Sequence, residues 1–253
     1  MFVYHLSRIY FRVCLNFAQK KLIKLLRGKF KQALNLFSIL FLTGSQLLKL
    51  FPIFAYINKL LKNKFMLKIL VTYAVQGEFA EIKWSDAEVY YVRTGIGKVK
   101  SAFHLAEAIR QVEPDIVINM GTAGTIHHKV GDVFVCRHFI DRDMHKLAGF
   151  GLSYELDTSA LLEQKGFCKH WTESATCNTG DSFLTELTDI EGDVVDMEAY
   201  AQAFVCNSKE IPFISVKYVS DVIGQNSVKH WEDKLADARV GLSHFFNVLK
   251  ESI

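Results

Sequence analysis

After residue 65, the chain alternates continuous apolar runs with segments of helical periodicity. Residues 67–73, 87–93 and 115–120 read LKILVTY, AEVYYVR and DIVINM, and such short runs are typical of strands that are covered on both faces. Between the second and third runs, the sequence predicts a helix with one apolar face, formed by Val99, Ala102, Phe103, Ala106 and Ile109. A strand, helix, strand unit of this kind requires a parallel sheet with helices packed against it.

Further strands are predicted at 130–140, 192–197 and 211–220, and a further helix at 199–207. The chain ends in a predicted helix whose apolar side carries Trp231, Leu235, Ala238, Leu242, Phe245 and Leu249. The sequence therefore predicts an α/β fold with three layers, αβα, around a mixed, largely parallel central sheet.

Residues 1–65 differ in composition from residues 66–253, and we treat the two as separate domains. The first part holds 12 of the 30 lysines and arginines and no acid, which leaves a net charge of −9 for the second. Between Lys31 and Lys49 lie 17 uncharged residues, just under the ~18 to 20 of a spanning helix. Three interpretations stay open: a membrane anchor or basic interfacial helix pair, a targeting extension, or translated sequence upstream of a start at Met66. We favour a start at Met66, because it directly precedes the first expected strand; the intact mass of the native protein tests this.

Composition argues against several classes of partner. The negative second domain repels nucleic acid, and a membrane becomes a partner only if residues 1–65 are real and retained. The adjacent His127 and His128, and Cys168 near His170, are too few to specify a metal site, and no cofactor is expected. An odd set of cysteines without a CxxC pair favours reduced thiols and a cytoplasmic protein: Cys14, Cys136, Cys168, Cys177 and Cys206.

The segment VVDMEAYA, residues 194–201, places Asp196 and Glu198 in a run that otherwise reads as core. A buried carboxylate without a partner is strongly unfavourable, so these acids need either a protein partner or a ligand. The ordinary alternative is that they are strand-end or helix-start acids, since acids are favoured where a helix begins.

Position in the expected sheet gives a test, because ligand sites of such folds lie at the carboxyl ends of the strands. Five segments follow predicted strands: YAVQGEF at 73–79 with Glu78, TGIGKVK at 94–100, MGTAGT at 120–125, MEAYA at 197–201 and SDVIG at 220–224. TGIGKVK lacks the third glycine of a dinucleotide fingerprint, so it predicts only close backbone approach and free amides at a helix start. MGTAG predicts the same with small residues, to which Thr122 adds a hydroxyl. The alternative for both segments is that they are simply tight turns between a strand and a helix.

Together these segments resemble the purine nucleoside phosphorylase and nucleosidase family, and within it most closely the 5′-methylthioadenosine/S-adenosylhomocysteine nucleosidases. The motifs occur in order from about Leu67 to the C-terminus: GIGKV, INMGTAG, TGDSF at 179–183, VDMEAYA and VSD at 219–221. No part of residues 1–65 contributes to the resemblance. It implies a nucleoside phosphorylase-like fold and an enzyme of purine nucleoside catabolism and methionine salvage that hydrolyses an N-glycosidic bond, with adenine nucleosides as substrates.

The resemblance also implies a role for each acid. Asp221 matches the acid that protonates purine N7, which requires burial or a neighbouring hydrogen bond that keeps a proton on it. Glu78 matches the carboxylate that activates the attacking water. Glu198 matches the residue that accepts hydrogen bonds from the ribose 2′ and 3′ hydroxyls, and Asp196 is left as a supporting residue. The other expected substrate contacts are Met197 beside the sugar, Ser182, Phe183 and Leu184 at the purine, and Gly121, Thr122 and Ser220.

Water and phosphate remain alternative acceptors. Family phosphorylases carry an arginine two residues before the glycine of the GTAG-like turn, where this chain has Asn119, and the loss of that guanidinium favours hydrolysis. Arg93, Lys98 and Lys217 lie near the same edge and are the candidates to replace it. A nucleoside-binding protein without turnover is the third alternative. By resemblance we also expect a homodimer.

Overall fold

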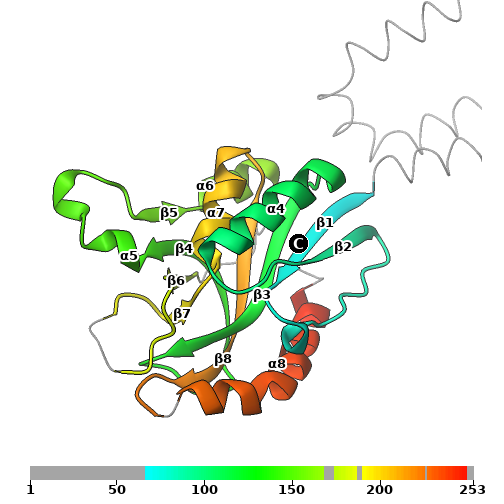
Figure 1. Ribbon diagram of the computed structural model, residues 1–253. Helices are drawn as coiled ribbons and strands as arrows, with labels where there is room; N and C mark the ends of the chain where they lie inside the picture. The colour runs from blue at the N-terminus through cyan, green and yellow to red at the C-terminus, as the bar shows by residue number, and fades with distance from the viewer. Residues whose placement is uncertain (1–65, 168–173, 187–189, 226, 250–253) are drawn as a thin grey trace, which may run out of the picture. The chain divides into compact units, whose positions relative to one another are not determined.

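A computed structural model describes residues 66–167, 174–186, 190–225 and 227–249 (Figure 1). The extension at 1–65 and the Cys168 and His170 pair lie outside these ranges, so the interpretations of both stay predictions. Within the ranges, no helix is long and apolar enough to cross a bilayer.

The described strands form one eight-stranded sheet with the order β2-β1-β3-β7-β6-β4-β5, while β8 pairs with β3 and β4. Five of its pairings are parallel and three are antiparallel, which confirms the predicted mixed, largely parallel sheet. The strands are β1 (Leu67–Tyr73), β2 (Ala87–Arg93), β3 (Ile116–Thr125), β4 (Val133–Asp141), β5 (Glu155–Asp157), β6 (Ala175–Thr179), β7 (Val194–Asp196) and β8 (Phe213–Val222).

Part of the sheet closes on itself. Strand β3 pairs with β8, β8 with β4, β4 with β6, β6 with β7, and β7 returns to β3 through the single pair Val195 and Gly124. The register of β3 on β8 shifts between Ala123 and Gly124, a bulge of the kind that bends a strand. The ring gathers the ends of β3, β6, β7 and β8 around one space.

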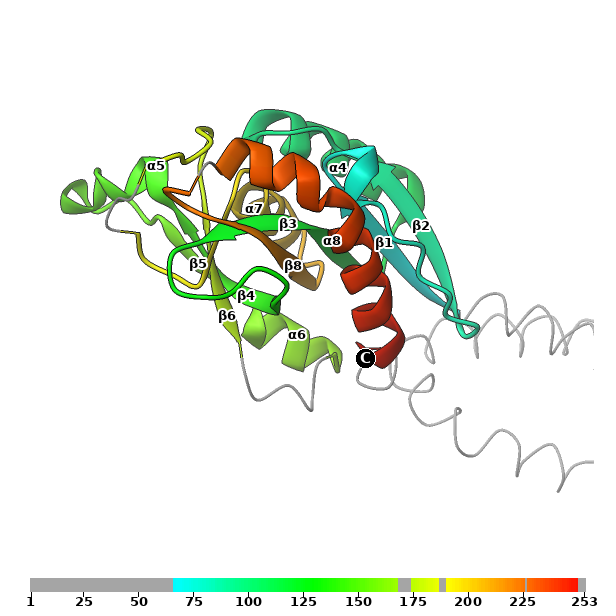
Figure 2. The same cartoon turned by 90° about the horizontal axis from the view of Figure 1, so that it is seen from below.

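Helices cover both faces of the sheet (Figures 1 and 2). On one face α4 (Lys98–Val112) and α7 (Ala199–Ser208) pack side by side, and on the other lies the long terminal helix α8 (Ser227–Leu249). The short elements are η1 (Gln76–Glu78), α5 (Arg142–His145), η2 (Ala148–Phe150) and α6 (Ser159–Lys165). This arrangement confirms the αβα layers.

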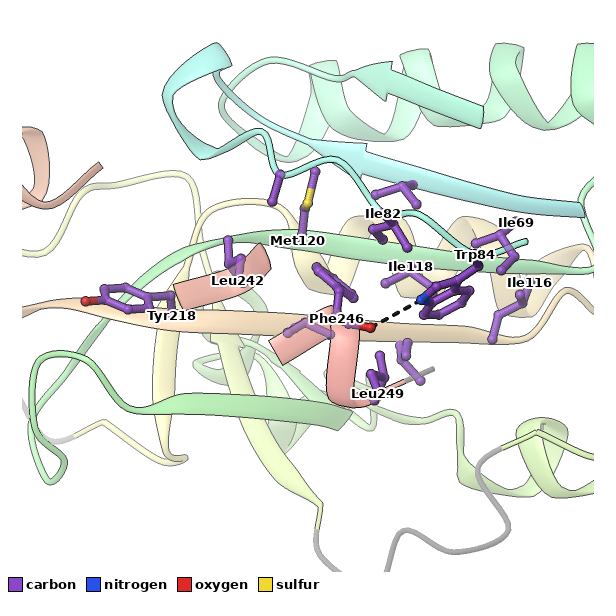
Figure 3. Close-up of a cluster of buried hydrophobic side chains, with 14 of the residues drawn as sticks. Ile69, Ile82, Trp84, Ile116, Ile118, Met120, Tyr218, Leu242, Phe246 and Leu249 are labelled. Atoms are coloured by element: carbon purple, nitrogen blue, oxygen red, sulfur yellow. Dashed lines mark hydrogen bonds between the residues drawn. The ribbon is translucent and has the colours of Figure 1, made fainter. Parts of the chain in front are cut away.

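Alternation along the strands builds two cores. Ile69 and Val71 of β1 face the cluster that includes α8, whereas Leu70 between them faces the cluster with α4 and α7, as expected for side chains with a period of two. In the α8 cluster, Trp84 Nε1 donates to the backbone oxygen of Phe246 at 3.2 Å (Figure 3). Both faces are therefore apolar, which explains why the strand runs are continuous.

The main difference from the prediction is the end of β3. We expected the third strand to end at 120 and MGTAGT to turn into a helix, but β3 continues to Thr125. Small residues permit this, because the strand passes close to Glu78 at Gly121 and to Asp221 and Ile223 at Gly124. The short elements β5, α6 and β6 were not predicted, since their few residues carry no clear periodicity.

Candidate active site

A pocket of about 370 Å³ lies where several strands end. Its lining comes from the segments after β1, β2, β6 and β7 and from the last residues of β3 and β8. Of the eleven predicted site residues, the structure brings ten together here, namely Glu78, Thr122, Ser182, Phe183, Leu184, Asp196, Met197, Glu198, Ser220 and Asp221. Glu78, Glu198 and Asp221 thus share one pocket although they are far apart in the sequence.

Glu78, the last residue of η1, is buried and held in a fixed orientation. Its Oε1 accepts hydrogen bonds from Thr122 N at 2.9 Å and Thr122 Oγ1 at 2.5 Å, and its Oε2 accepts one from Val75 N at 3.3 Å. Gly121, the one predicted residue that does not line the pocket, packs behind it, where an added Cβ would stand 3.4 Å from Oε1. Trp231 Nε1 donates to Thr122 Oγ1 at 2.8 Å, so the Thr122 hydroxyl accepts from Trp231 and donates its own proton to Glu78.

Glu198 stands at the start of α7 and faces the turn before α4. Its Oε1 accepts a hydrogen bond from Gly97 N at 3.0 Å. Gly97 has a φ of 96°, a conformation that favours glycine. Its amide was expected to be free, but it is bonded to a carboxyl group of the protein. Burial, and then the charge of Asp196, raise the pKa of Glu198 to about 8. At neutral pH this side chain therefore favours its protonated form.

Asp196, at the end of β7, is paired inside the protein. Its carboxylate lies 2.8 Å from Lys217 Nζ of β8, and the two side chains are 1% and 2% exposed. Thr179 Oγ1 and Ala199 N also donate to it, at 2.5 and 2.8 Å. Burial opposes ionisation of Asp196, but the charge of Lys217 outweighs it and lowers the pKa. Asp196 therefore has a protein partner, and it ties β7, β8 and the start of α7 together.

Asp221, near the end of β8, is buried and lies beside Ser220. Ser220 Oγ lies 2.7 Å from Asp221 Oδ1 and 3.3 Å from the carbonyl oxygen of Ala123. A hydroxyl has one proton for these two acceptors. A proton on Asp221 would let the carboxyl donate to Ser220 Oγ while Ser220 donates to Ala123, so the geometry suits a protonated acid.

The segment after β6 forms another wall of the pocket. Phe183 is 40% exposed, and its ring centroid lies 6.3 Å from that of Trp231, with the planes inclined at 66°. Leu184 instead packs against the small apolar cluster that contains Ile223. Ser182 offers its carbonyl oxygen to Arg142. This wall presents an accessible ring and backbone groups rather than charges.

The candidate phosphate-binding cations are largely engaged elsewhere. Asn119, at the position of the family arginine, is buried and bonded to Thr72 and Ser215. Lys217 is paired with Asp196, and Lys98 Nζ lies 2.9 Å from Asp141 and 2.7 Å from Asp143. Arg93 is exposed at the end of β2. Of these candidates, Lys98 and Lys217 are therefore not free to hold a phosphate.

Ten of the twenty lining residues are not among the predicted site residues, and of these ten only Arg142 and Trp231 carry polar groups on their side chains. Trp231 was assigned to the apolar side of the last helix, where its need for a partner at the indole N–H was the available signal. Arg142 directly follows β4, so the rule on strand ends could have found it. In the part of the chain that the structure describes, no group of three or more acids, histidines or cysteines could hold a metal ion.

Fold and pocket together define a three-layer α/β protein with an acid-lined pocket for a small organic molecule at its strand ends. The chain belongs to the phosphorylase superfamily, whose family model matches residues 59–253. A curated relative is the 5′-methylthioadenosine/S-adenosylhomocysteine nucleosidase of Bacillus velezensis. It is 31% identical over 201 residues, which cover 68% of this chain and 85% of the relative. The predicted family is therefore confirmed.

Solved structures share the fold. The 5′-methylthioadenosine/S-adenosylhomocysteine nucleosidase of Helicobacter pylori with butyl-thio-DADMe-Immucillin-A has a TM-score of 0.61 and 18% identity, covering 75% of this chain and all of that one. The corresponding enzyme of Colwellia psychrerythraea, in complex with adenine, has a TM-score of 0.61 and 24% identity, covering 74% of this chain and 96% of that one. At these identities the likeness establishes the architecture.

Proposed function

We propose that this protein is an N-glycosyl hydrolase that cleaves a purine nucleoside, with adenine as the released base. One observation carries the proposal: Glu78, Glu198 and Asp221, each with a different environment, line one pocket. Cleavage of an N-glycosidic bond needs a proton for the departing base, an activated water and a grip on the sugar, and three carboxyl groups can divide these tasks.

In the proposed reaction, water attacks C1′ of the ribose as the bond from C1′ to N9 breaks. Glu78 takes a proton from this water, and the electron pair of the broken bond goes to the purine. Asp221 gives its proton to purine N7, so adenine leaves as a neutral base and the sugar leaves with the hydroxyl. The fixed carboxylate of Glu78 and the position of Asp221 beside Ser220 support these roles.

Glu198 is proposed to bind the ribose 2′ and 3′ hydroxyls. Because burial raises its pKa to about 8, the free enzyme holds a neutral carboxyl here, which can donate one hydrogen bond and accept others. A diol offers both donors and acceptors, so it can satisfy this group. Met197 is the adjacent apolar contact in the lining.

Water is the proposed acceptor rather than phosphate. Two observations support this choice: Lys98 and Lys217 are paired with acids of the protein, and Asn119 is bonded inside the protein.

For the substrate we propose 5′-methylthioadenosine, S-adenosylhomocysteine or a related adenine nucleoside, because the curated relative is named for its action on these two compounds. This would place the enzyme in nucleoside catabolism and methionine salvage.

We further propose a cytoplasmic homodimer. The described cysteines Cys136, Cys177 and Cys206 are free and buried, as is usual in a reducing compartment.

The proposal of a dimer rests on the neighbouring helices α4 and α7. They expose large apolar side chains, with Val99 at 79%, Phe103 at 64% and Phe204 at 58%. Such a surface is suited to a second copy of the chain. Analytical ultracentrifugation tests it, because Phe103→Glu should shift a dimer to the monomer.

The deciding experiment incubates the full chain with a panel of adenine, hypoxanthine and guanine nucleosides, with and without phosphate, and separates the products by chromatography. We expect free adenine and free ribose derivatives in phosphate-free buffer. A strict requirement for phosphate would replace the hydrolase with a phosphorylase. Binding of nucleosides without any product would identify a binding protein.

A further inference from the structure

Arg142 of α5 gathers four backbone carbonyl groups. Its Nη1 donates to the oxygens of Asn178 and Asp196 at 3.0 and 3.1 Å, and its Nη2 donates to those of Gly180 and Ser182 at 3.2 and 2.5 Å. Hydrogen bonds from a charged donor are stronger than those between neutral groups. One side chain thus holds the end of β6, the end of β7 and the wall segment 180–183.

The guanidinium is packed as closely as the chain permits. An added Cβ at Gly180 would lie 2.5 Å from Arg142 Nε, so only glycine fits there. Nε itself is buried, and it has no hydrogen-bond partner among the described residues. The neighbouring backbone thus satisfies the two terminal nitrogens of Arg142 but not Nε.

The next residue, Asp143, holds the same segment from a second direction. Its Oδ2 accepts a hydrogen bond from Asp181 N at 2.9 Å and lies 2.7 Å from Lys98 Nζ. Asp181 Oδ1 in turn accepts from Lys98 N at 2.8 Å. Lys98 directly follows Gly97, whose amide bonds to Glu198, so this ring of contacts joins the wall segment to the turn at Glu198.

We propose that the pair Arg142 and Asp143 is a clamp that fixes segment 180–183 and thereby determines which nucleobase the pocket accepts. The inference rests on the proposed function. A trans peptide is planar, and its N–H points opposite to its C=O. When Arg142 holds the carbonyl of Ser182, it therefore also fixes the direction of the Phe183 N–H, which is the donor that meets the base in this scheme.

A fixed donor discriminates between bases by chemistry. Ring N1 of a 6-aminopurine accepts a hydrogen bond, whereas N1 of a 6-oxopurine carries a hydrogen and donates one. A backbone donor held in place rewards the first and leaves an unpaired group against the second, which is a strong source of selectivity. Arg142 is a positioning residue in this scheme, because it acts through the backbone of the segment and not on the base.

The test compares full-length wild type, Arg142→Met and Arg142→Lys. We measure kcat and KM for adenosine and inosine, and the Kd of free adenine by calorimetry. For Arg142→Met we expect adenine Kd to rise about 10-fold or more and the preference for adenosine over inosine to fall by a similar factor. The kcat for adenosine should change less than KM, and Arg142→Lys should restore part of the loss, since it keeps a cation but not the fork.

Controls separate this proposal from loss of folding and from failure of the proposed function. Arg110→Ala removes an exposed arginine of α4 paired with Glu107 and should change neither Kd nor preference. Asp143→Ala, on a partly exposed side chain, removes the contacts to Asp181 N and Lys98 Nζ but leaves Arg142 in place. It should raise adenine Kd about threefold, and it decides the matter if Arg142→Met does not fold. Adenine binding without cleavage would refute the hydrolase but leave the clamp to be judged by Kd. A folded Arg142→Met protein with wild-type Kd and preference overturns the clamp.

Discussion

Two walls of the pocket are built in different ways. The sugar-side wall, formed by Asp196, Met197, Glu198 and the supporting Lys217, contains the buried ion pair of Asp196 and Lys217 and a glutamate whose pKa is raised by burial. The purine-side wall, residues 182–184 with Asp221, offers an accessible aromatic ring and an acid beside a hydroxyl. The first wall is made rigid by strands β7 and β8, and the second by side chains that reach its backbone.

This contrast predicts which property each wall controls. Substitutions on the sugar side should disturb folding, because they leave buried charges without partners. Substitutions on the purine side should disturb binding and turnover and have little effect on stability. Four variants test the contrast, two on each side.

The largest effect is expected for Lys217→Met. It leaves Asp196 ionised and buried without its cation, and breaking such a pair costs about 3–5 kcal/mol. Chemical denaturation of the variant and wild type measures the difference. Lys129→Met, at an exposed position, is the control and should change stability by less than about 0.5 kcal/mol. The double variant with Asp196→Leu should recover much of the loss; equal stability of Lys217→Met and wild type would contradict the contrast.

Asp221→Asn should have the next largest effect, and on activity alone. Asparagine keeps the shape but has no proton to give to the leaving base, so base release should fall at least about 100-fold. Chromatographic initial rates measure this, and calorimetry should still detect nucleoside binding. Asp237→Asn, on the surface of α8, is the matched control. Turnover at the wild-type rate would remove Asp221 from the proposed mechanism.

The sequence predicted the fold because its strongest patterns are local. The run LKILVTY and the helix after Gly97 are where they were expected. The predicted apolar face of that helix was wrong, because Val99 and Phe103 are 79% and 64% exposed. The buried face instead carries Ser101, Leu105, Ala108 and Ile109. The end of β3 was not predicted, because Gly121 to Thr125 are shaped by their closeness to Glu78 and Asp221. That constraint comes from residues distant in the sequence.

The candidate site was predicted in the same uneven way. Motif resemblance found the three acids, but it did not reveal that Asp196 is neutralised by Lys217, 21 positions away and on another strand. It also left Arg142 unnoticed, because the partners of this side chain are backbone carbonyls, which no residue type marks. Pairings that depend on tertiary contact require coordinates.

The third variant, Glu198→Gln, returns to the sugar side through pH. The pKa of about 8 in the folded protein lies above the ordinary value of 4.5, so the folded protein binds this proton more tightly than the unfolded chain does. Stability from this group is fully present below pH 4.5 and is lost as pH rises through about 8. Glutamine does not titrate, so the stability of Glu198→Gln relative to wild type should grow between pH 5 and pH 8, by about 3–4 kcal/mol.

Thermal unfolding at several pH values measures this difference. Glu107→Gln, on the exposed face of α4, is the matched control and should show almost no pH-dependent difference. A constant gap between Glu198→Gln and wild type over the whole range would mean that Glu198 titrates normally, and the sugar-side wall would then resemble the purine-side wall.

Phe183→Ala should have the smallest effect and tests the purine side alone. Base stacking on an aromatic ring is worth about 1–3 kcal/mol, and we expect the lower limit, a roughly fivefold rise in KM, because Phe183 is 40% exposed and Trp231 still borders the pocket. The melting temperature should not change, since little apolar area is lost from the core. Phe150→Ala, at a side chain 82% exposed, controls for the loss of a ring. If Phe183→Ala cost more free energy of unfolding than free energy of substrate binding, the purine-side wall would be part of the hydrophobic core, because only a ring packed for stability behaves in that way.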